Sequence, residues 1–188
     1  QVVIVNAPKK DGLVNPTEAQ FAEILAKVKK ADIAPYADNT VKEPLIPANA
    51  NLKGSKVKKE EAGEFGTTVW TLENGMQIIV KPTEYKKDQV MLSLEFNGGK
   101  TLIDTKDMNS FEDNIWALFQ QNSGISKFSG KNVPKMLAGK NVGMNPYIGG
   151  TQHGISGSST PKDIETAFQL MYLLFTEPRF DAEEYATG

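Results

Sequence analysis

The chain offers few of the imidazole and thiol side chains that commonly act as a general base, a nucleophile or a zinc ligand. Among its 188 residues it has one histidine, His153, and no cysteine. The lack of cysteine excludes thiolate nucleophiles, disulfides and thiolate metal sites. A zinc site with two imidazoles on one helix face, spaced as in H-E-x-x-H, needs a second histidine. This chain alone cannot build such a site, and no residue is assigned a catalytic or metal-binding role.

His153 is the residue around which a hydrolytic site could still be built. It lies in a Gly- and Ser-rich segment, residues 151–159, but the sequence has no Gly-x-Ser-x-Gly elbow for a Ser-His-acid triad. We predict that His153 is a surface or half-buried residue held by a local hydrogen bond. A metal-free hydrolase that uses His153 is an alternative, which replacement of His153 by alanine would test.

Two other patterns resemble functional sites but are interpreted as structural. Residues 124–131 contain glycines and a lysine, as a phosphate-binding loop does, but five residues separate the glycines and Asn132 follows the lysine. We predict a flexible loop there. Glu112 and Asp113 are adjacent on a predicted helix and point in different directions, which favours a solvated face over an acid–base pair. The sequence does not identify substrate-binding residues.

The charge pattern disfavours nucleic acid and membrane partners. The chain carries 21 basic and 23 acidic residues, a net charge of -2, and the two signs are interspersed. No apolar run approaches the roughly 20 residues that a membrane helix needs. The first residues lack a charged leader, so we expect any targeting signal to lie outside this chain. Cytoplasm and cell envelope are both left open, because a chain without cysteine is indifferent to redox conditions.

A hairpin and a third strand form the clearest predicted unit. Residues 67–72 and 76–80 are apolar, β-branched runs that flank Asn74 and Gly75, and Asn-Gly is a strong tight-turn signal because both residues accept positive φ. Residues 88–97 then alternate, so that Val90, Leu92 and Leu94 share one face. This pattern predicts a strand with one wet side.

Helices are predicted before and after these strands. Asn15 is the expected cap of the first, with Pro16 at its first position and apolar residues from Phe21 to Val28 at helical spacing. A second amphipathic helix is predicted over residues 107–121, and a third begins at Thr160. The apolar face of the third is expected to carry Ile164, Phe168, Met171 and Phe175.

The remaining segments are shorter. Residues 2–5 form a continuous apolar run that is typical of a buried strand, although nothing precedes it to pair with. A short helix is predicted over 133–138, strands over 141–148 and 151–159, and the start of another helix over 181–184. The whole predicts an α+β fold in which helices cover one face of an antiparallel sheet.

Residues 31–65 show neither helical nor strand periodicity. Pro35, Pro44 and Pro47 interrupt the segment and residues 56–61 are mostly charged, so we interpret 31–65 as a linker between two domains. The alternative is a long loop draped over one domain, which the apolar residues Leu45 and Ile46 would allow. The predicted divisions are therefore 1–30, 31–65 and 66–188.

Several segments together resemble the insulinase/pitrilysin-type zinc peptidases of the M16 family, specifically the middle of a long bacterial member. None of the segments is a catalytic motif, so the resemblance is collective, and it extends over nearly the whole chain. The segments are Val3–Pro8, Pro44–Pro47, Phe65–Thr83, Lys135–Lys140, Asn145–Gly150, Ser156–Asp163 and Phe175–Asp181.

Members of that family carry two similar halves, each a helix-covered antiparallel sheet, which close around a peptide like a clamshell. The resemblance implies that 1–30 is the tail end of the first half, 31–65 the interdomain linker, and 66–188 the incomplete, non-catalytic second half. Residues 107–116 occupy the place of the zinc-binding helix and contain no histidine.

On this resemblance the chain is a fragment of a zinc metallopeptidase that walls the peptide chamber and is inactive alone. Zinc is expected to bind to the missing catalytic half. No cofactor is expected to bind to this chain. The expected partners are that catalytic half and peptide substrates. The alternative from a different class is a stand-alone peptide-binding or assembly module that adds a strand at a sheet edge.

Overall fold

The computed structural model describes residues 2–8, 12, 14–34, 41–108 and 123–187. The chain divides into two compact units, residues 1–39 and 40–188. Most of the helix predicted over 107–121, including Glu112 and Asp113, falls outside the described residues. Within the described part, no helix combines the length and the apolarity needed to cross a bilayer.

The first unit contains one helix, α1 (Glu18–Lys30). Its cap is Thr17 rather than the predicted Asn15, because Thr17 and Gln20 form a complete capping box. The Thr17 hydroxyl accepts the Gln20 N–H at 3.3 Å, and the Gln20 Oε1 accepts the Thr17 N–H at 2.8 Å. Residues 2–5 are exposed and are not a strand, so the prediction of a buried strand there was wrong.

The second unit begins with a three-stranded antiparallel sheet in the order β1–β2–β3. Its strands are β1 (Val57–Ala62), β2 (Thr68–Leu72) and β3 (Gln77–Val80). A 3₁₀ turn, η1 (Glu64–Gly66), joins the first two. Strand β1 lies inside the range predicted as a linker, and its Glu60 accepts a hydrogen bond from the Trp70 indole N–H at 2.9 Å across the pair.

The predicted hairpin is confirmed, but its turn differs from the expected one. The Leu72 N–H donates to the Met76 carbonyl at 2.8 Å and the Gly75 N–H to the Leu72 carbonyl at 3.0 Å, so three residues form the loop. Gly75 alone in this loop has positive φ, at 87°. This arrangement is a three-residue hairpin that needs one left-handed residue, where the two-residue type I′ turn typical of Asn-Gly would need two.

A second antiparallel sheet has the order β4–β6–β5. Its strands are β4 (Val90–Asn97), β5 (Val142–Ile148) and β6 (Gln152–Ser159), all close to their predicted bounds. Between β4 and β5 lie two 3₁₀ turns, η2 (Gly99–Leu102) and η3 (Thr105–Asp107), and the short helix α4 (Asn132–Met136), which was also predicted. The fold is therefore α+β as expected, but the strands form two small sheets where the sequence predicted one, and the hairpin lies in a different sheet from β4.

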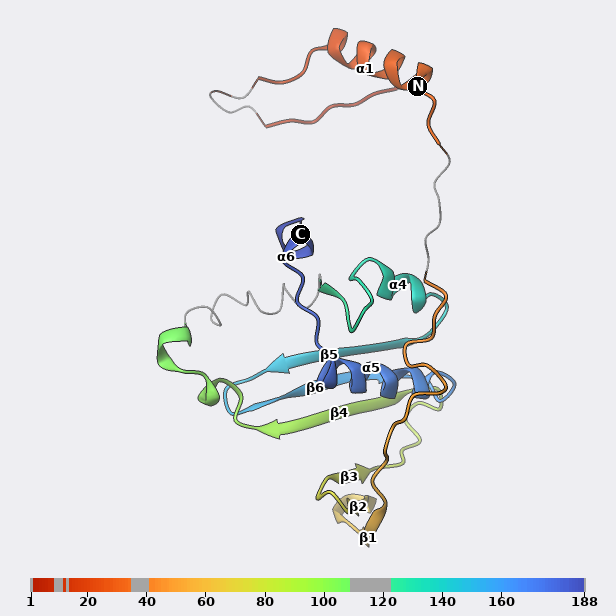
Figure 1. Cartoon of the computed structure of the whole chain (residues 1–188), viewed down its shortest axis with the longest axis vertical. Helices are drawn as coiled ribbons and strands as arrows, with labels where there is room; N and C mark the ends of the chain where they lie inside the picture. The colour runs from red at the N-terminus through yellow and green to blue at the C-terminus, as the bar shows by residue number, and fades with distance from the viewer. Residues whose placement is uncertain (1, 9–11, 13, 35–40, 109–122, 188) are drawn as a thin grey trace. The chain divides into compact units, whose positions relative to one another are not determined.

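Helix α5 (Ile164–Thr176) lies across one face of this sheet (Figure 1), and α6 (Ala182–Thr187) follows it. The predicted apolar face of α5 was only partly right: Ile164 and Met171 are half-buried, and Met171 packs against the core. Phe168 and Phe175 are 53% and 58% exposed, whereas Ala167, Leu170 and Leu173 are buried. Helix α5 is apolar nearly all round, so packing rather than periodicity selects the buried side.

The core of the second unit lies between α5 and the sheet. It includes Ile155 from β6 and Met144 from β5, together with the buried residues of α5. Leu45, from the range predicted as a linker, is also buried in this core, and Glu43 beside it forms an ion pair with Lys127. The segment around Leu45 is therefore packed on the second unit.

Candidate functional site

The face of the β4–β6–β5 sheet opposite α5 is rich in small polar side chains. We call this surface the polar face, because alternate residues of all three strands point to it. Its members are Met91, Ser93, Glu95 and Asn97 of β4, Gln152, Gly154, Ser156 and Ser158 of β6, and Gly143, Asn145 and Tyr147 of β5.

The strand register brings hydroxyl and amide groups into one row across the polar face. Ser93 pairs with Ser156, and Ser156 pairs with Asn145 on its other side. All three side chains are exposed. The Ser93 hydroxyl donates to the Glu95 carboxylate at 2.9 Å, and Glu95 is the only acidic or basic residue among the members of the face. The face can therefore donate and accept hydrogen bonds with little charge.

Glycine gives the polar face a shallow centre. Gly154 pairs with Glu95 on β4 and with Tyr147 on β5, so a residue without a side chain separates a carboxylate from a phenol. A Cβ at Gly154 would lie 1.9 Å from the Leu94 carbonyl oxygen. Strands β4 and β6 therefore approach each other in a way that only glycine permits.

His153 lies on the other face of β6, toward α5, and is half-buried as predicted. Its Nδ1 accepts the backbone N–H of Gly99 at 3.2 Å, and Gly99 is buried. The ring stacks on Phe96 with 5.6 Å between centroids, and Phe96 stacks on Phe175 at 5.2 Å. This local hydrogen bond and the ring stack explain His153 without a catalytic role.

The loop that superficially resembles a phosphate-binding loop is part of the core. Ile125 and Phe128 are each only 2% exposed, and the Ser126 hydroxyl donates to the Glu177 carboxylate. The Ser126 N–H also donates to the Glu177 carbonyl at 3.0 Å. The prediction of a flexible loop was wrong, because two large apolar side chains anchor the loop.

The surroundings of Asp163 favour its ionised form. Its Oδ2 accepts the Asn141 N–H at 2.9 Å and the Thr160 hydroxyl at 3.1 Å. The hydrogen bond from Asn141, followed by that from Thr160 and the charges of Lys140 and Lys162, holds the pKa of Asp163 below its ordinary value against the opposing effect of burial. The Asp163 carboxylate therefore links the turn before α5 to the residue that precedes β5.

The described residues do not fit a zinc centre. Within residues 2–8, 12, 14–34, 41–108 and 123–187, no three side chains of the histidine, cysteine, aspartate or glutamate type come together as metal ligands. The Nδ1 of His153 is already occupied by the Gly99 N–H. A single imidazole held in this way does not make a tetrahedral site.

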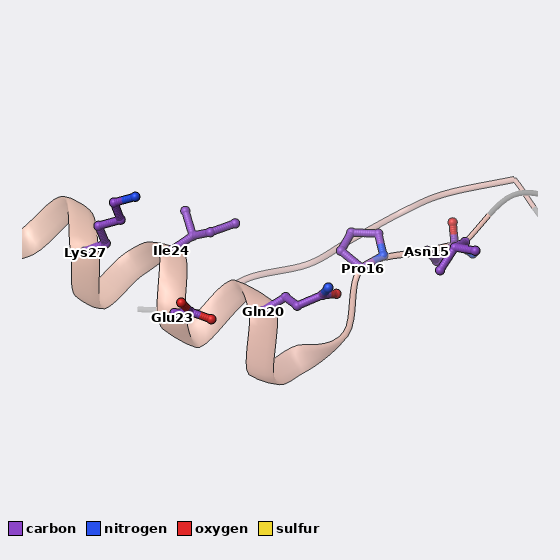
Figure 2. Close-up of a pocket in the computed structure, with 7 residues that line it drawn as sticks. Asn15, Pro16, Gln20, Glu23, Ile24 and Lys27 are labelled. Carbon is purple, nitrogen blue, oxygen red and sulfur yellow. The ribbon is translucent and has the colours of Figure 1, made fainter.

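The first unit carries a groove beside α1, with a volume of about 510 Å³. Figure 2 shows Gln20, Glu23, Ile24 and Lys27 along the helix, with Asn15 and Pro16 from the preceding segment. The groove mixes an amide, a carboxylate, an ammonium and an apolar side chain. We assign no catalytic role to this groove.

Sequence reasoning missed the polar face, although its signal was present. Ser156 and Ser158 were seen only as part of a Gly- and Ser-rich strand, and Asn145 as part of a weakly alternating one. Their common position depends on the register of β5 and β6, in which Asn145 pairs with Ser156. A period-two count along β6 places Ser156 and Ser158 on one face, but only the pairing with β5 adds Asn145 to it.

Comparison with known proteins finds relatives both in sequence and in structure. No protein-family model matches the chain. A "zinc protease PQQL-like" protein of Arabidopsis thaliana is 24% identical over 177 residues, which are 94% of this chain and 16% of that protein. The chain therefore spans less than one fifth of this curated relative.

Two of the structural relatives are proteases. The periplasmic protease PqqL from Escherichia coli has a TM-score of 0.69 at 17% identity, with 92% of this chain covering 19% of that one. The ferredoxin protease FusC, in complex with Arabidopsis ferredoxin, has a TM-score of 0.58 at 19% identity, with coverage of 90% and 18%. These likenesses show the fold. Together with the sequence relative, they confirm the resemblance to M16-type zinc proteases that the motifs indicated.

Proposed function

We propose that this chain contributes a non-catalytic part of a zinc metallopeptidase of the M16 type and forms a wall of its peptide chamber. The observation that carries the proposal is the match to a zinc protease over 94% of the chain in a sequence with a single histidine and no cysteine. Zinc and the groups that activate water would then be supplied by polypeptide outside this chain.

The polar face is the surface we assign to the wall. A peptide chamber must hold many sequences, and neutral hydroxyl and amide groups bond to peptide main chain without selecting a side chain. The row of Ser93, Ser156 and Asn145 has this chemistry and is exposed. Helix α5 occupies the opposite face, so peptide would contact the sheet and not the helices.

The proposed division of the chain follows the same interpretation. Residues 1–30 would complete the preceding half, 31–65 would form the interdomain linker, and 66–188 would begin the second half. Burial of Leu45 in the core of the second unit supports attachment of the linker to that half from about the middle of the linker onward. Partners would be the catalytic half of the same polypeptide and peptide substrates.

A bulky substitution on the polar face tests the role of the wall. In the natural polypeptide that contains this chain, Ser156→Trp would obstruct the chamber and lower kcat/KM for peptide substrates. Ala138→Trp is the matched control, because Ala138 is exposed after α4 and outside the polar face. Equal activity of both variants, each with wild-type stability, would contradict the proposed wall.

A second candidate function uses the edge of the sheet. Strand β4 is an edge strand among the described residues and contains no proline. It could accept an extended peptide by strand addition and so act as a binding or assembly module. This function predicts peptide binding by the isolated chain that a chelator does not change, measurable by calorimetry.

A further inference from the structure

The two outer strands of the β4–β6–β5 sheet differ in what their backbones offer at the edge. In an antiparallel pair, residues alternate between hydrogen-bonded pairs and pairs whose N–H and C=O groups point away from the partner. The Gly149 N–H donates to the Gln152 carbonyl at 2.8 Å, which makes Gly149 and Gln152 a hydrogen-bonded pair. Their register fixes the direction of every backbone group in β5.

By that register, Pro146 lies in a pair that points outward. Pro146 is opposite Ile155, three residues before the hydrogen-bonded Gly149, so its backbone nitrogen faces away from β6. Met144 and Ile148 face the same way. The central one of these three outward positions therefore has no N–H to donate, and its ring occupies the space that an added strand would need.

Strand β4 lacks this feature. The Gly98 N–H donates to the Thr151 carbonyl at 2.7 Å, so the same alternation turns the backbone N–H groups of Met91, Ser93 and Glu95 outward. None of the three is proline. Proline on one outer strand only is one of the ways in which sheets prevent pairing with another chain.

We propose that Pro146 closes the β5 edge to strand addition. An extended peptide lying against this unit would then contact the side chains of the polar face. It would not form a ladder of backbone hydrogen bonds with β5. If the chain forms part of a peptide chamber, a step that rests on the proposed function, the peptide would not pair with β5. Its main chain would then be free to pair with a strand elsewhere. The closure itself depends only on β5 and its register.

The test uses the complete 188-residue chain and a defined probe, an acetylated and amidated hexapeptide of alternating threonine and valine. Backbone amide resonances of Met144 and Ile148 are followed by NMR as the probe is added. We expect no shift in the wild-type chain. Pro146→Val restores the missing donor, and we expect both amides to shift with the probe. Pro146→Thr is a second variant in case valine disturbs the strand.

Tyr147→Val is the matched control, since it changes a side chain of β5 but no backbone donor, and it should behave like the wild type. Probe-dependent shifts of Met144 and Ile148 in the wild-type chain or in this control would overturn the proposal. The proposal would also be overturned if the Pro146→Val and Pro146→Thr variants fold but the amide resonances of Met144 and Ile148 do not shift when the probe is added. These results concern β5 alone, so they are separate from the effect of Ser156→Trp on protease activity.

Discussion

The carboxylate of Asp163 accepts a hydrogen bond from the backbone N–H of Asn141 at 2.9 Å, which joins the start of α5 to the residue before β5. The Thr160 hydroxyl completes the contact from within the connecting turn. Strand β6 runs directly into this turn. The Asp163 carboxylate therefore holds the start of α5 next to the start of β5.

This contact predicts a specific loss of stability in acid. Because the folded chain holds the pKa of Asp163 below its ordinary value of 3.8, the ionised group stabilises the fold above that value. The stabilisation is lost as pH falls through the lowered folded pKa. Asp163→Asn should therefore have a lower urea midpoint than the wild type at neutral pH, and the difference should shrink below pH 3.8.

Asp88→Asn is the control, since Asp88 is exposed in a turn. It makes the same change of charge and should leave the urea midpoint close to the wild-type value at both pH values. A difference between wild type and Asp163→Asn that stays constant down to strongly acidic pH would contradict the ionic role of Asp163.

Leu170→Ala should test which side of α5 faces the sheet. Leu170 is 5% exposed, and truncation of a buried leucine typically costs about 2–5 kcal/mol of unfolding free energy. Phe168→Ala is the paired variant, and it should cost about 1 kcal/mol or less because more than half of its surface is in water. Chemical denaturation measures both. A larger loss of unfolding free energy for Phe168→Ala than for Leu170→Ala would contradict the observed packing and favour the face of α5 that periodicity predicted.

Gly154→Ala should destabilise the fold by about 1–3 kcal/mol, because the added Cβ has no room beside the backbone of Leu94. Gly150→Ala is matched in chemistry, and a Cβ there would meet no atom within 4 Å. The two variants are compared by thermal and urea unfolding. Equal stability of both would show that β4 and β6 do not approach as closely at Gly154 as described.

His153→Phe should keep a ring to stack on Phe96 but leave the buried Gly99 N–H without its acceptor. Loss of one partner of a buried hydrogen bond costs about 1–3 kcal/mol, and amide exchange at Gly99 should accelerate. His153→Asn places an oxygen near the position of Nδ1 and should recover part of the loss. If His153→Phe leaves Gly99 exchange unchanged, the hydrogen bond at 3.2 Å has no structural role.

Local signals in the sequence were sufficient where the deciding residues are neighbours. Asn74 and Gly75 indicated the hairpin because a turn depends on its own backbone, and the alternation of Leu92 and Leu94 indicated β4. Strand β1 was missed because its residues are mostly charged and its partner is β2, which a local pattern cannot reveal. Its charges suit an edge strand.

Packing decided the remaining differences. Helix α5 is apolar on several sides, so no periodicity could show that Ala167 and Leu170 are buried while Phe168 is not. The core position of Leu45 depends on a contact with distant segments. The polar face likewise exists only once Asn145 and Ser156 are paired. These features are set by long-range register, which a single sequence does not encode locally.

Our central proposal is that this chain, as part of a zinc metallopeptidase, supplies no metal centre for peptide cleavage. Elemental analysis of the purified chain, after exposure to zinc and removal of the excess, tests it most directly, together with a peptide cleavage assay on the same sample. We predict no stoichiometric zinc and no cleavage. One tightly bound zinc per chain, lost together with activity when a chelator is added, would contradict the account.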